Sequence, residues 1–395
     1  MQTVRQFYLR YWRGIALGLS LIVIAFLLYF PRLSSLLPGY SAPELKAYAS
    51  ANNWHSIVGN PINAPYKVLV WLFSAEIHHS IFITRAVAAS FALALALLFF
   101  VVARAWYSYR AAFLATIIFM TSAGLLHFAR LGTGDILQMG ILALLGAALW
   151  YRTQRRHRVL ITYLLVALAA LLLYVPGMFW FELLGLILLR TAVIRQLRHT
   201  KTLHLVGLAV VVLACLAPLI RASLKHPMLL RQLSGLPQNL NTVKHFASNL
   251  WNLVLAIVVH SNGNPLFWVG HAPLLNAVEV IVGLLGAFYI YHGTSKRRSV
   301  LLFGWLGIGL VLVSLGGDVT FAYLVPLLYL FIGNGLDHLL KRWLTVFPRN
   351  PIARMTGIGI ICVMLGFSVL YQVRTYYVAW PNAPTTRTAF SHLAP

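Results

Sequence analysis

The sequence predicts an all-α, polytopic integral membrane protein with about eleven transmembrane helices and short amphipathic helices at its outer face. Hydrophobic residues make up 60% of the 395 residues and charged residues only 10%, whereas soluble domains have about 25% charged residues. Lys and Arg number 31 against 7 Asp and Glu, which gives a formal net charge of +24. The basic residues fall mainly in short loops between apolar runs, so they indicate membrane topology and not nucleic-acid binding.

Each expected span is an apolar run long enough to cross a hydrocarbon layer about 30 Å thick, which takes about 20 residues, or fewer where the ends are aromatic or basic. The expected spans are Gly14–Phe30, Phe82–Ala103, Ala111–Phe128, Asp135–Trp150, Val159–Tyr174, Met178–Leu189, Leu203–Leu219, Asn276–His292, Val300–Leu315, Val319–Leu339 and Thr356–Val373. Around Trp71, before the second span, we expect a short interfacial helix.

The orientation follows from Lys and Arg, which are enriched in cytoplasmic loops. A cytoplasmic N-terminus places at least two basic residues in every short inner loop, as with Arg104 and Arg110 after the second span. We therefore expect a multi-pass protein of the cell membrane. All acids except Asp337 then fall at or near the outer face: Glu44, Glu76, Asp135, Glu182, Glu279 and Asp318. A carboxylate near the membrane is costly unless it is paired, which makes these residues functional candidates.

The chain divides into a transmembrane domain, residues 1–339, and a second part, residues 340–395, with a basic inner loop, a last span and a short outer tail. The domain contains a first outer loop with interfacial helices, residues 31–79, and a second outer segment, residues 221–275. Four cations of the second segment run against the positive-inside bias: Arg221, Lys225, Arg231 and Lys244. They indicate either a phosphate partner or contact with lipid headgroups.

Two acids are candidates for acid–base chemistry. Glu44 lies in the stretch Pro31–Lys67 between two apolar runs, and Asp135 begins a span five residues after Arg130. Glu44 is either a site carboxylate or a solvated side chain paired with Lys46. Asp135 is either a site acid or a helix cap with a local salt bridge to Arg130.

Cofactor signals are weak. No pair of histidines has a compact metal-ligand spacing, so no metal site is predicted and a divalent cation is left open. The glycines are scattered through apolar runs and form no phosphate-binding loop, so a donor embedded in the membrane fits better than a nucleotide sugar. Cys215 and Cys362 lie in apolar runs, and we expect two small buried hydrophobic residues and no disulfide.

Five stretches carry a resemblance to a known family. In chain order they are GYSAPELKAYASANNW, NPINAPYKVLVWLF, HFARLGTGDILQMGILALLGAALW, GNPLFWVGHAPLLNAVEVIVGLLGAFY and VTFAYLVPLLYLFIGNGL. They resemble the C-type glycosyltransferases, in particular the family of the dolichyl-phosphate-mannose protein mannosyltransferases and the bacterial aminoarabinose lipid A transferases. The resemblance covers roughly Arg5 to Leu339, and its first half is the more specific.

The chain departs from the pattern of that family at two points. If Glu44 takes the second acidic position, Pro43 stands where the family usually has its catalytic Asp. The Lys that commonly precedes the double proline is missing in the region of Asn63 and Ala64, although Lys67 follows closely. Either Glu44 serves as the base alone, or the chemistry has been altered or lost.

The resemblance implies a glycosyltransferase that moves a sugar from a polyprenyl-phosphate donor to an acceptor of the cell envelope, a lipid, protein or glycan, at the outer face and with inversion. Glu44 and Asp135 are the expected catalytic acids. The residues expected at the donor phosphate are Arg130, Lys67, Arg221, Lys225, Arg231 and Tyr323. The expected partners are thus the polyprenyl-phosphate sugar, the acceptor and the lipid bilayer. A transporter or flippase for a lipid-linked sugar and a catalytically inactive relative are the alternatives.

Overall fold

A computed structural model of the protein describes residues 2–76, 82–153, 158–237, 244–293 and 295–392. The end of the expected first outer loop, residues 77–79, lies outside the described residues. Within them the protein is built of helices, and the β-structure is one isolated bridge, between Tyr40 and His392. The all-α fold class predicted from the sequence is therefore confirmed.

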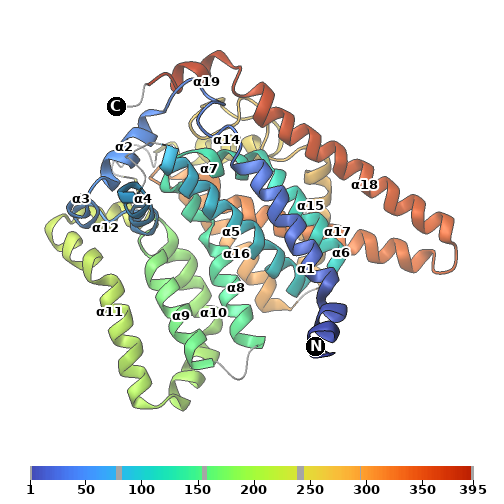
Figure 1. Cartoon of the computed structure of the whole chain (residues 1–395), viewed down its shortest axis with the longest axis horizontal. Helices are drawn as coiled ribbons and strands as arrows, with labels where there is room; N and C mark the ends of the chain where they lie inside the picture. The colour runs from blue at the N-terminus through green and yellow to red at the C-terminus, as the bar shows by residue number, and fades with distance from the viewer. Residues whose placement is uncertain (1, 77–81, 154–157, 238–243, 294, 393–395) are drawn as a thin grey trace.

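The helices in chain order are α1 (Gln2–Tyr29), α2 (Ala42–Ala51), α3 (Trp54–Gly59), α4 (Ala64–Glu76), α5 (Phe82–Trp106), α6 (Tyr109–Thr121), α7 (Ala123–Arg130), η1 (Gly134–Gly140), α8 (Ile141–Thr153), α9 (Arg158–Leu172), α10 (Met178–His199), α11 (Thr202–Lys225), α12 (Met228–Leu233), α14 (Phe246–Val258), α15 (Ala277–Gly293), α16 (Lys296–Ser314), η2 (Phe321–Tyr323), α17 (Leu324–Val346), α18 (Pro351–Arg374), η3 (Thr375–Ala379) and α19 (Pro384–Ala389). The short helices α2, α3, α4, α14 and α19 gather at one end of a bundle of long helices, which is the top in Figure 1.

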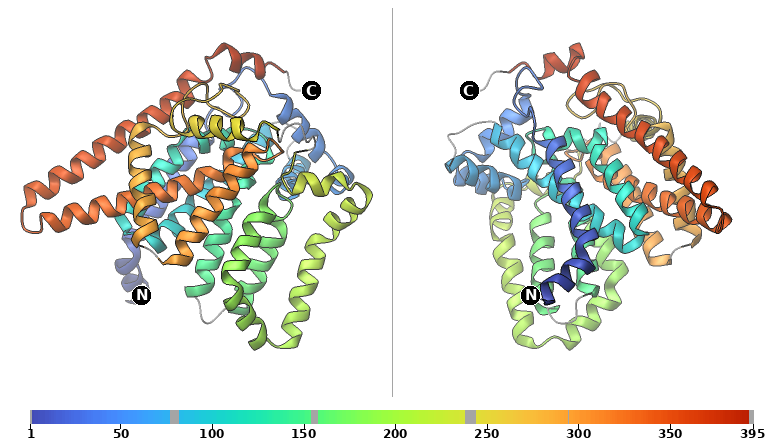
Figure 2. Two further views of the ribbon diagram at one scale, coloured as in Figure 1. Left: turned by 180° about the vertical axis from the view of Figure 1, so that it is seen from behind. Right: turned by 45° about the vertical axis from the view of Figure 1, so that its right-hand side comes forward.

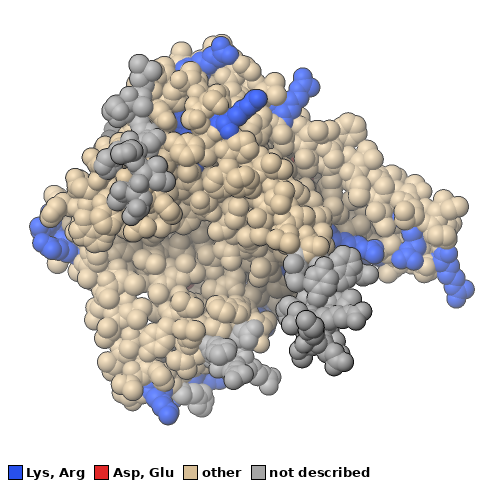
Figure 3. Space-filling model, viewed as in Figure 1, with Lys and Arg blue, Asp and Glu red and all other residues tan. Residues whose placement is uncertain are grey.

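The long helices make this a multi-pass membrane protein. Among the described residues six segments are long and apolar enough to cross a membrane: Phe82–Trp106, Gly134–Thr153, Thr202–Lys225, Lys296–Ser314, Phe321–Val346 and Pro351–Ala379. The bent pair α6 and α7 makes a seventh, and four further apolar helices are shorter: Ala16–Tyr29, Val159–Leu172, Phe246–Val258 and Ala277–Gly293. The predicted count of eleven spans is not confirmed by length and composition alone. On the face in Figure 3, the body of the molecule between the peripheral Lys and Arg side chains carries no visible charge.

One expected span is broken. The sequence predicts a continuous helix over Ala111–Phe128, but α6 ends at Thr121 and α7 begins at Ala123, with a bend of 55° between them. Ser122 adopts an extended backbone (φ −61°, ψ 136°), and its hydroxyl oxygen accepts a hydrogen bond from the amide of Leu125. Ser and Thr compete with helix hydrogen bonds in this way, so they favour caps over helix interiors. The bend turns α7 across the end of the bundle.

The centre of the bundle depends on a close crossing of α15 and α17. A Cβ atom on Gly286 would overlap the carbonyl oxygen of Phe331, and one on Gly335 would overlap the carbonyl oxygen of Val282. Without a hydrophobic driving force between helices in lipid, such close backbone approach is a main source of packing energy. In Figure 1, α17 then continues into a long hairpin with α18 that projects from one side of the bundle.

Candidate active site

Glu44 lies in the first turn of α2 and is fully buried. Its Oε2 atom accepts hydrogen bonds from the amide (2.9 Å) and the hydroxyl (3.1 Å) of Ser41, the residue that begins the helix. This is one half of a capping box, in which an acid at the third position of a helix satisfies the amide of the N-cap. Pro43, at the position of the family's usual Asp, fits the first turn because its missing N–H has no helical partner there. The local sequence therefore explains both residues as a helix start.

Arg85 in α5 is the partner of Glu44, and sequence reasoning missed it. Its Nε atom donates to Glu44 Oε1 at 2.7 Å, and its Nη2 atom donates to Oε2 at 3.0 Å. It also donates to the carbonyl oxygens of Leu33 (2.8 Å) and Gly39 (2.9 Å), and it lies over the ring of Tyr40. Arg85 is 1% exposed and Glu44 is 0% exposed. The sequence feature that could have indicated this role is an arginine within an otherwise apolar span, because such an arginine requires a partner.

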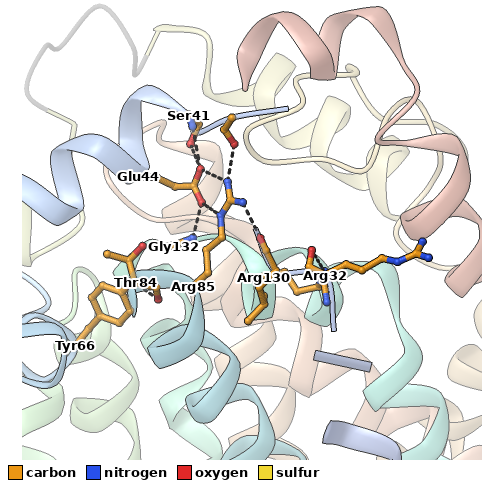
Figure 4. A network of polar contacts seen from close by, with 10 residues as sticks. Arg32, Ser41, Glu44, Tyr66, Thr84, Arg85, Arg130 and Gly132 are labelled. Atoms are coloured by element: carbon orange, nitrogen blue, oxygen red, sulfur yellow. Dashed lines mark hydrogen bonds and ion pairs between the residues drawn. The ribbon is translucent and has the colours of Figure 1, made fainter. Parts of the chain in front are cut away.

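Glu44 also binds the turn before η1. The amide of Gly132 donates to Glu44 Oε1 at 2.9 Å, as Figure 4 shows. A Cβ atom at Gly132 would overlap the hydroxyl of Thr84, so the backbone can approach this closely only with glycine. Five donor contacts thus converge on the two oxygens of Glu44. In this arrangement its carboxylate is a positioning group with no free lone pair to take a proton.

Arg130 does not contact Asp135. Its Nη1 atom donates to the carbonyl oxygens of Tyr29 (3.0 Å) and Leu28 (3.3 Å), and its Nη2 atom donates to that of Arg32 (3.0 Å). The first two carbonyl groups end α1, where a cation is favourable because it compensates the negative end of the helix, and that of Arg32 follows three residues later. The ion pairs in the described part of the chain are Arg85 with Glu44 and Lys341 with Asp337. The predicted local salt bridge of Arg130 to Asp135 is therefore wrong in this structure.

Asp135 is the partly exposed acid at this end of the bundle. It lies in the first turn of η1, and its Oδ2 atom accepts a hydrogen bond from the hydroxyl of Thr133 at 2.9 Å. Gln138 of η1 donates from its Nε2 atom to the carbonyl oxygen of Asp318 at 3.3 Å. The two backbone segments are joined by Gln138, whose Oε1 atom accepts from the amide and the hydroxyl of Thr320, both at 2.9 Å. The tertiary structure therefore brings together two segments, far apart in the chain, that each carry a carboxylate.

Lys67 lies in the first turn of α4. It is 7% exposed, and its Nζ atom donates to the carbonyl oxygen of Asn60 at 2.8 Å. Burial lowers the pKa of Lys67 to about 8, and the positive charge of Lys46 contributes in the same direction. One turn earlier, Asn63 has a positive φ of 56° and packs against Gly134, which precedes Asp135. The start of α4 is thus held against the start of η1.

Asn63 has a buried side-chain oxygen without a hydrogen-bond partner. Its backbone amide donates to the carbonyl oxygen of Tyr174 at 2.8 Å, which connects the turn before α4 to the segment after α9. Its side-chain Oδ1 atom is buried and has no hydrogen-bond partner. A buried acceptor without a partner destabilises the fold by about 1–3 kcal/mol, so it marks a place where a ligand donor is favourable.

The remaining predicted donor residues lie elsewhere. Tyr323 is fully buried; its hydroxyl donates to the carbonyl oxygen of Pro176 at 2.7 Å, and its ring stacks on Phe181. These contacts are those of a packing residue. Arg221 and Lys225 are exposed on α11, and Arg231 is partly exposed on α12. Nothing in the described residues joins the latter three to Asp135 or Lys67 by a hydrogen bond or an ion pair.

An apolar cavity of about 650 Å³ opens between α3, α4, α5, η1, α9 and α11. Its lining includes Ile136, next to Asp135, and Pro61, next to the Asn60 that binds Lys67. Leu95 of α5 and Cys215 of α11 line it as well. The prediction of two buried cysteines is wrong: both are free thiols, Cys215 is half-buried at the cavity, and Cys362 is exposed on α18. Within the described residues, no group of three or more His, Cys, Asp or Glu side chains is placed to hold a metal ion.

Comparisons with known proteins bear on the fold. No protein-family model and no curated protein matches the sequence. The oligosaccharyltransferase of Archaeoglobus fulgidus, solved with a tethered acceptor peptide, has a TM-score of 0.55 at 15% identity, over 99% of this chain and 60% of that chain. ArnT from Cupriavidus metallidurans, solved with undecaprenyl phosphate, has a TM-score of 0.49 at 15% identity, over 94% of this chain and 76% of that chain. The chain thus spans about 60% of the length of the oligosaccharyltransferase. It has the fold of the C-type membrane glycosyltransferases.

Proposed function

We propose that this protein is a membrane glycosyltransferase that moves a sugar from a polyprenyl phosphate to an envelope acceptor at the outer face of the cell membrane. The observation that carries the proposal is an apolar cavity whose lining includes Ile136, next to Asp135, and Val68, next to Lys67. An isoprenoid chain fits an apolar cavity within the membrane, whereas its phosphate needs a cation at the mouth. The shared fold supports the reaction class.

In this proposal Lys67 binds the donor phosphate. Its pKa of about 8 leaves it mainly protonated at neutral pH, and its burial strengthens the attraction to an anion. The Nζ atom gives one N–H to Asn60, which leaves two for phosphate oxygens. As the bond between the sugar C1 and the phosphate oxygen breaks, the phosphate gains negative charge, and the Lys67 cation stabilises it.

Asp135 takes the role of the base. The acceptor hydroxyl attacks C1 from the face opposite the phosphate, a bond forms between its oxygen and C1, and the configuration inverts. The hydroxyl proton passes to Asp135, which is partly exposed and binds Thr133 through one oxygen only. Glu44 and Arg85 act through Gly132, because they fix the backbone of the turn that ends at Asp135.

The two native cysteines provide a direct test of the donor site. Polyprenyl phosphate without a sugar should protect Cys215 from a membrane-permeant thiol reagent, since this residue lines the cavity. Cys362, exposed on α18, is the internal control and should react at the same rate with and without the lipid. Protection of neither cysteine, or of both equally, would reject the cavity as the donor site.

Turnover is tested separately. With a polyprenyl-phosphate sugar as donor, the Asp135→Asn variant should release sugar about 10²–10⁴-fold more slowly than the native protein, which is the usual contribution of a positioned base. Asp135→Glu keeps the carboxylate and should recover part of the rate. Equal rates in Asp135→Asn and native protein would reject the assignment of the base.

One observation favours a second candidate, a catalytically inactive protein that binds lipid-linked sugars. Pro43 stands at the position of the family's usual Asp, and the adjacent Glu44 is fully engaged in hydrogen bonds. Protection of Cys215 by the lipid without any release of sugar would favour this candidate. Movement of the lipid-linked sugar across a vesicle membrane without bond cleavage would favour a flippase.

A further inference from the structure

The segment that follows α18 folds back over the first loop. We call Thr375–His392 the strap; it comprises η3, α19 and the residues between and after them. The sequence predicts only a short outer tail here, but Tyr376, Trp380 and Phe390 are at most 2% exposed. Both views in Figure 2 show the strap beside the first loop at the same end of the bundle. The strap is therefore part of the folded core.

One anchor of the strap is a two-residue bridge to the first loop. The amide of Tyr40 donates to the carbonyl oxygen of His392 at 2.9 Å, and the amide of His392 donates back at 3.3 Å. Gly39 lies directly against this bridge: a Cβ atom there would overlap the carbonyl oxygen of His392 and lie 2.8 Å from that of Phe390. The backbone of the strap can sit here only because position 39 has no side chain.

The same two loop residues hold Arg85. The carbonyl oxygen of Gly39 accepts from Arg85 Nη2 at 2.9 Å, and the ring of Tyr40 lies 4.5 Å from the guanidinium carbon. Arg85 in turn binds Glu44, whose Oε1 atom accepts from the amide of Gly132. A continuous series of contacts therefore runs from the strap to the turn that carries Asp135.

A second anchor lies at the beginning of the strap. The hydroxyl of Tyr377 donates to the carbonyl oxygen of Leu28 at the end of α1 and accepts from Arg130 Nη1. The guanidinium group of Arg130 also lies over the Tyr377 ring at 5.1 Å. Arg130 ends the helix α7 that leads into the Gly132 turn. Both ends of the strap thus contact elements that lead to the Gly132 turn.

We propose that the strap is a positioning element of the active site, which keeps the first loop and the Gly132 turn in the geometry that sugar transfer requires. This inference rests on the proposed function. The strap stays closed during turnover, because its contacts are backbone bonds and buried aromatic rings. Its loss displaces Asp135 and leaves the apolar cavity, which no residue of the strap lines, unchanged.

The test uses two glycines of the first loop. Gly39→Ala forces the strap away from the loop, whereas Gly59→Ala is the matched control because a Cβ atom there meets nothing within 4 Å. In Gly39→Ala we expect kcat to fall by at least about tenfold, since small misplacements of reacting groups have large effects, and KM for the donor to stay unchanged. Gly59→Ala should keep both values. An unchanged kcat in Gly39→Ala, or an equal loss in both variants, overturns the proposal.

A crosslink tests whether the strap stays closed. Hydrogen-bonded residue pairs of antiparallel segments have Cα atoms about 5.5 Å apart, within the range of a disulfide. Tyr40→Cys combined with His392→Cys, in a protein with Cys215→Ala and Cys362→Ala, should form a disulfide. The oxidised and the reduced forms should have the same activity. The single variant Tyr40→Cys measures how much activity is lost with the Tyr40 ring itself. Activity that returns only after reduction would show that the strap must open, and would refute the inference.

A third measurement separates the strap from the proposed function. If the native protein transfers no sugar, the proposed function has failed, and the strap is judged by thiol labelling of Thr133→Cys in the protein with both native cysteines replaced by Ala. Thr133 is 6% exposed beside Asp135, so Gly39→Ala should speed its labelling at least about tenfold and Gly59→Ala should not. Equal labelling rates in the two variants would reject the strap as a positioning element.

Discussion

The substitution Glu44→Gln distinguishes a positioning carboxylate from a catalytic base. The amide of Gln has the shape of the carboxylate, but one of its oxygens is replaced by an NH2 group. In the structure Oε1 accepts from Arg85 Nε and Gly132 N, and Oε2 accepts from Ser41 N, Ser41 Oγ and Arg85 Nη2. Either orientation of the amide therefore places its NH2 group against at least two donors.

The magnitude follows from these contacts. Glu44→Gln leaves the Arg85 cation buried at 1% exposure without its counter-ion, and removal of one partner of a buried ion pair typically destabilises a protein by about 3–5 kcal/mol. Two donors that face the NH2 group add to this effect, at about 1–3 kcal/mol each, while the remaining carbonyl contacts of Arg85 reduce it. We expect a net loss of about 3–5 kcal/mol.

The assay is unfolding of the purified protein in detergent, followed together with sugar transfer. Glu44→Gln should unfold at a much lower temperature or denaturant concentration and lose activity in parallel. Asp135→Asn is the matched control: Asp135 is partly exposed and binds only the Thr133 hydroxyl, so its stability should change by less than about 1 kcal/mol.

A double variant completes the cycle. Arg85→Met with Glu44→Gln removes both charges, and the buried apolar side chain takes the place of the guanidinium group. It should be more stable than Arg85→Met alone, because a neutral pair avoids the isolated buried carboxylate. The reasoning is refuted if Glu44→Gln keeps native stability while kcat falls by about 10²–10⁴-fold, since that is the signature of a base.

Three further predictions follow from other parts of the structure. Burial lowers the pKa of Lys67 to about 8, so donor turnover should fall as the pH rises through about 8. Lys67→Arg should move this fall above pH 10. Rate profiles against pH test both expectations. Between about pH 8 and the ordinary lysine pKa of 10.5, the unfolded chain binds more protons than the folded chain. The free energy of unfolding of the native protein should therefore rise with pH in that window, and that of Lys67→Met should not. Unfolding measured as a function of pH tests this. Gly286→Ala should prevent stable folding, because its methyl group would overlap the backbone of α17, whereas Gly307→Ala meets nothing within 4 Å; a monodisperse Gly286→Ala protein in size-exclusion chromatography would contradict this.

Some of the candidate site could be predicted from local sequence. Glu44 is a rare acid between apolar runs, and Asp135 begins one, so composition and position indicate both as candidates, and the family resemblance adds the catalytic roles. The structure places Gly132, three residues before Asp135, in contact with Glu44. The role of Glu44 could not be predicted, because hydrogen-bond saturation depends on donors from α5 and from the Gly132 turn.

The partners of Arg85 and Arg130 show why the other contacts of the site could not be predicted from the sequence. Arg85 is 41 residues from Glu44 and Arg130 is 98 residues from Arg32. The nearest acid in sequence is the natural expectation for an arginine, and for Arg130 that expectation was Asp135. In the folded chain the guanidinium group instead binds carbonyl groups at and just after the end of α1, which no periodicity in the sequence reveals.

The sequence by itself determined that this chain is a helical membrane protein, because apolar length and the distribution of Lys and Arg are local properties that the bilayer selects directly. Only the tertiary structure decided which polar groups meet at the end of the bundle. In a low-dielectric interior a buried charge is stable only with a partner of the right geometry, and that partner is set by the packing of distant helices. The pairing of Glu44 with Arg85, the bend at Ser122 and the strap over the first loop are all decided at that level.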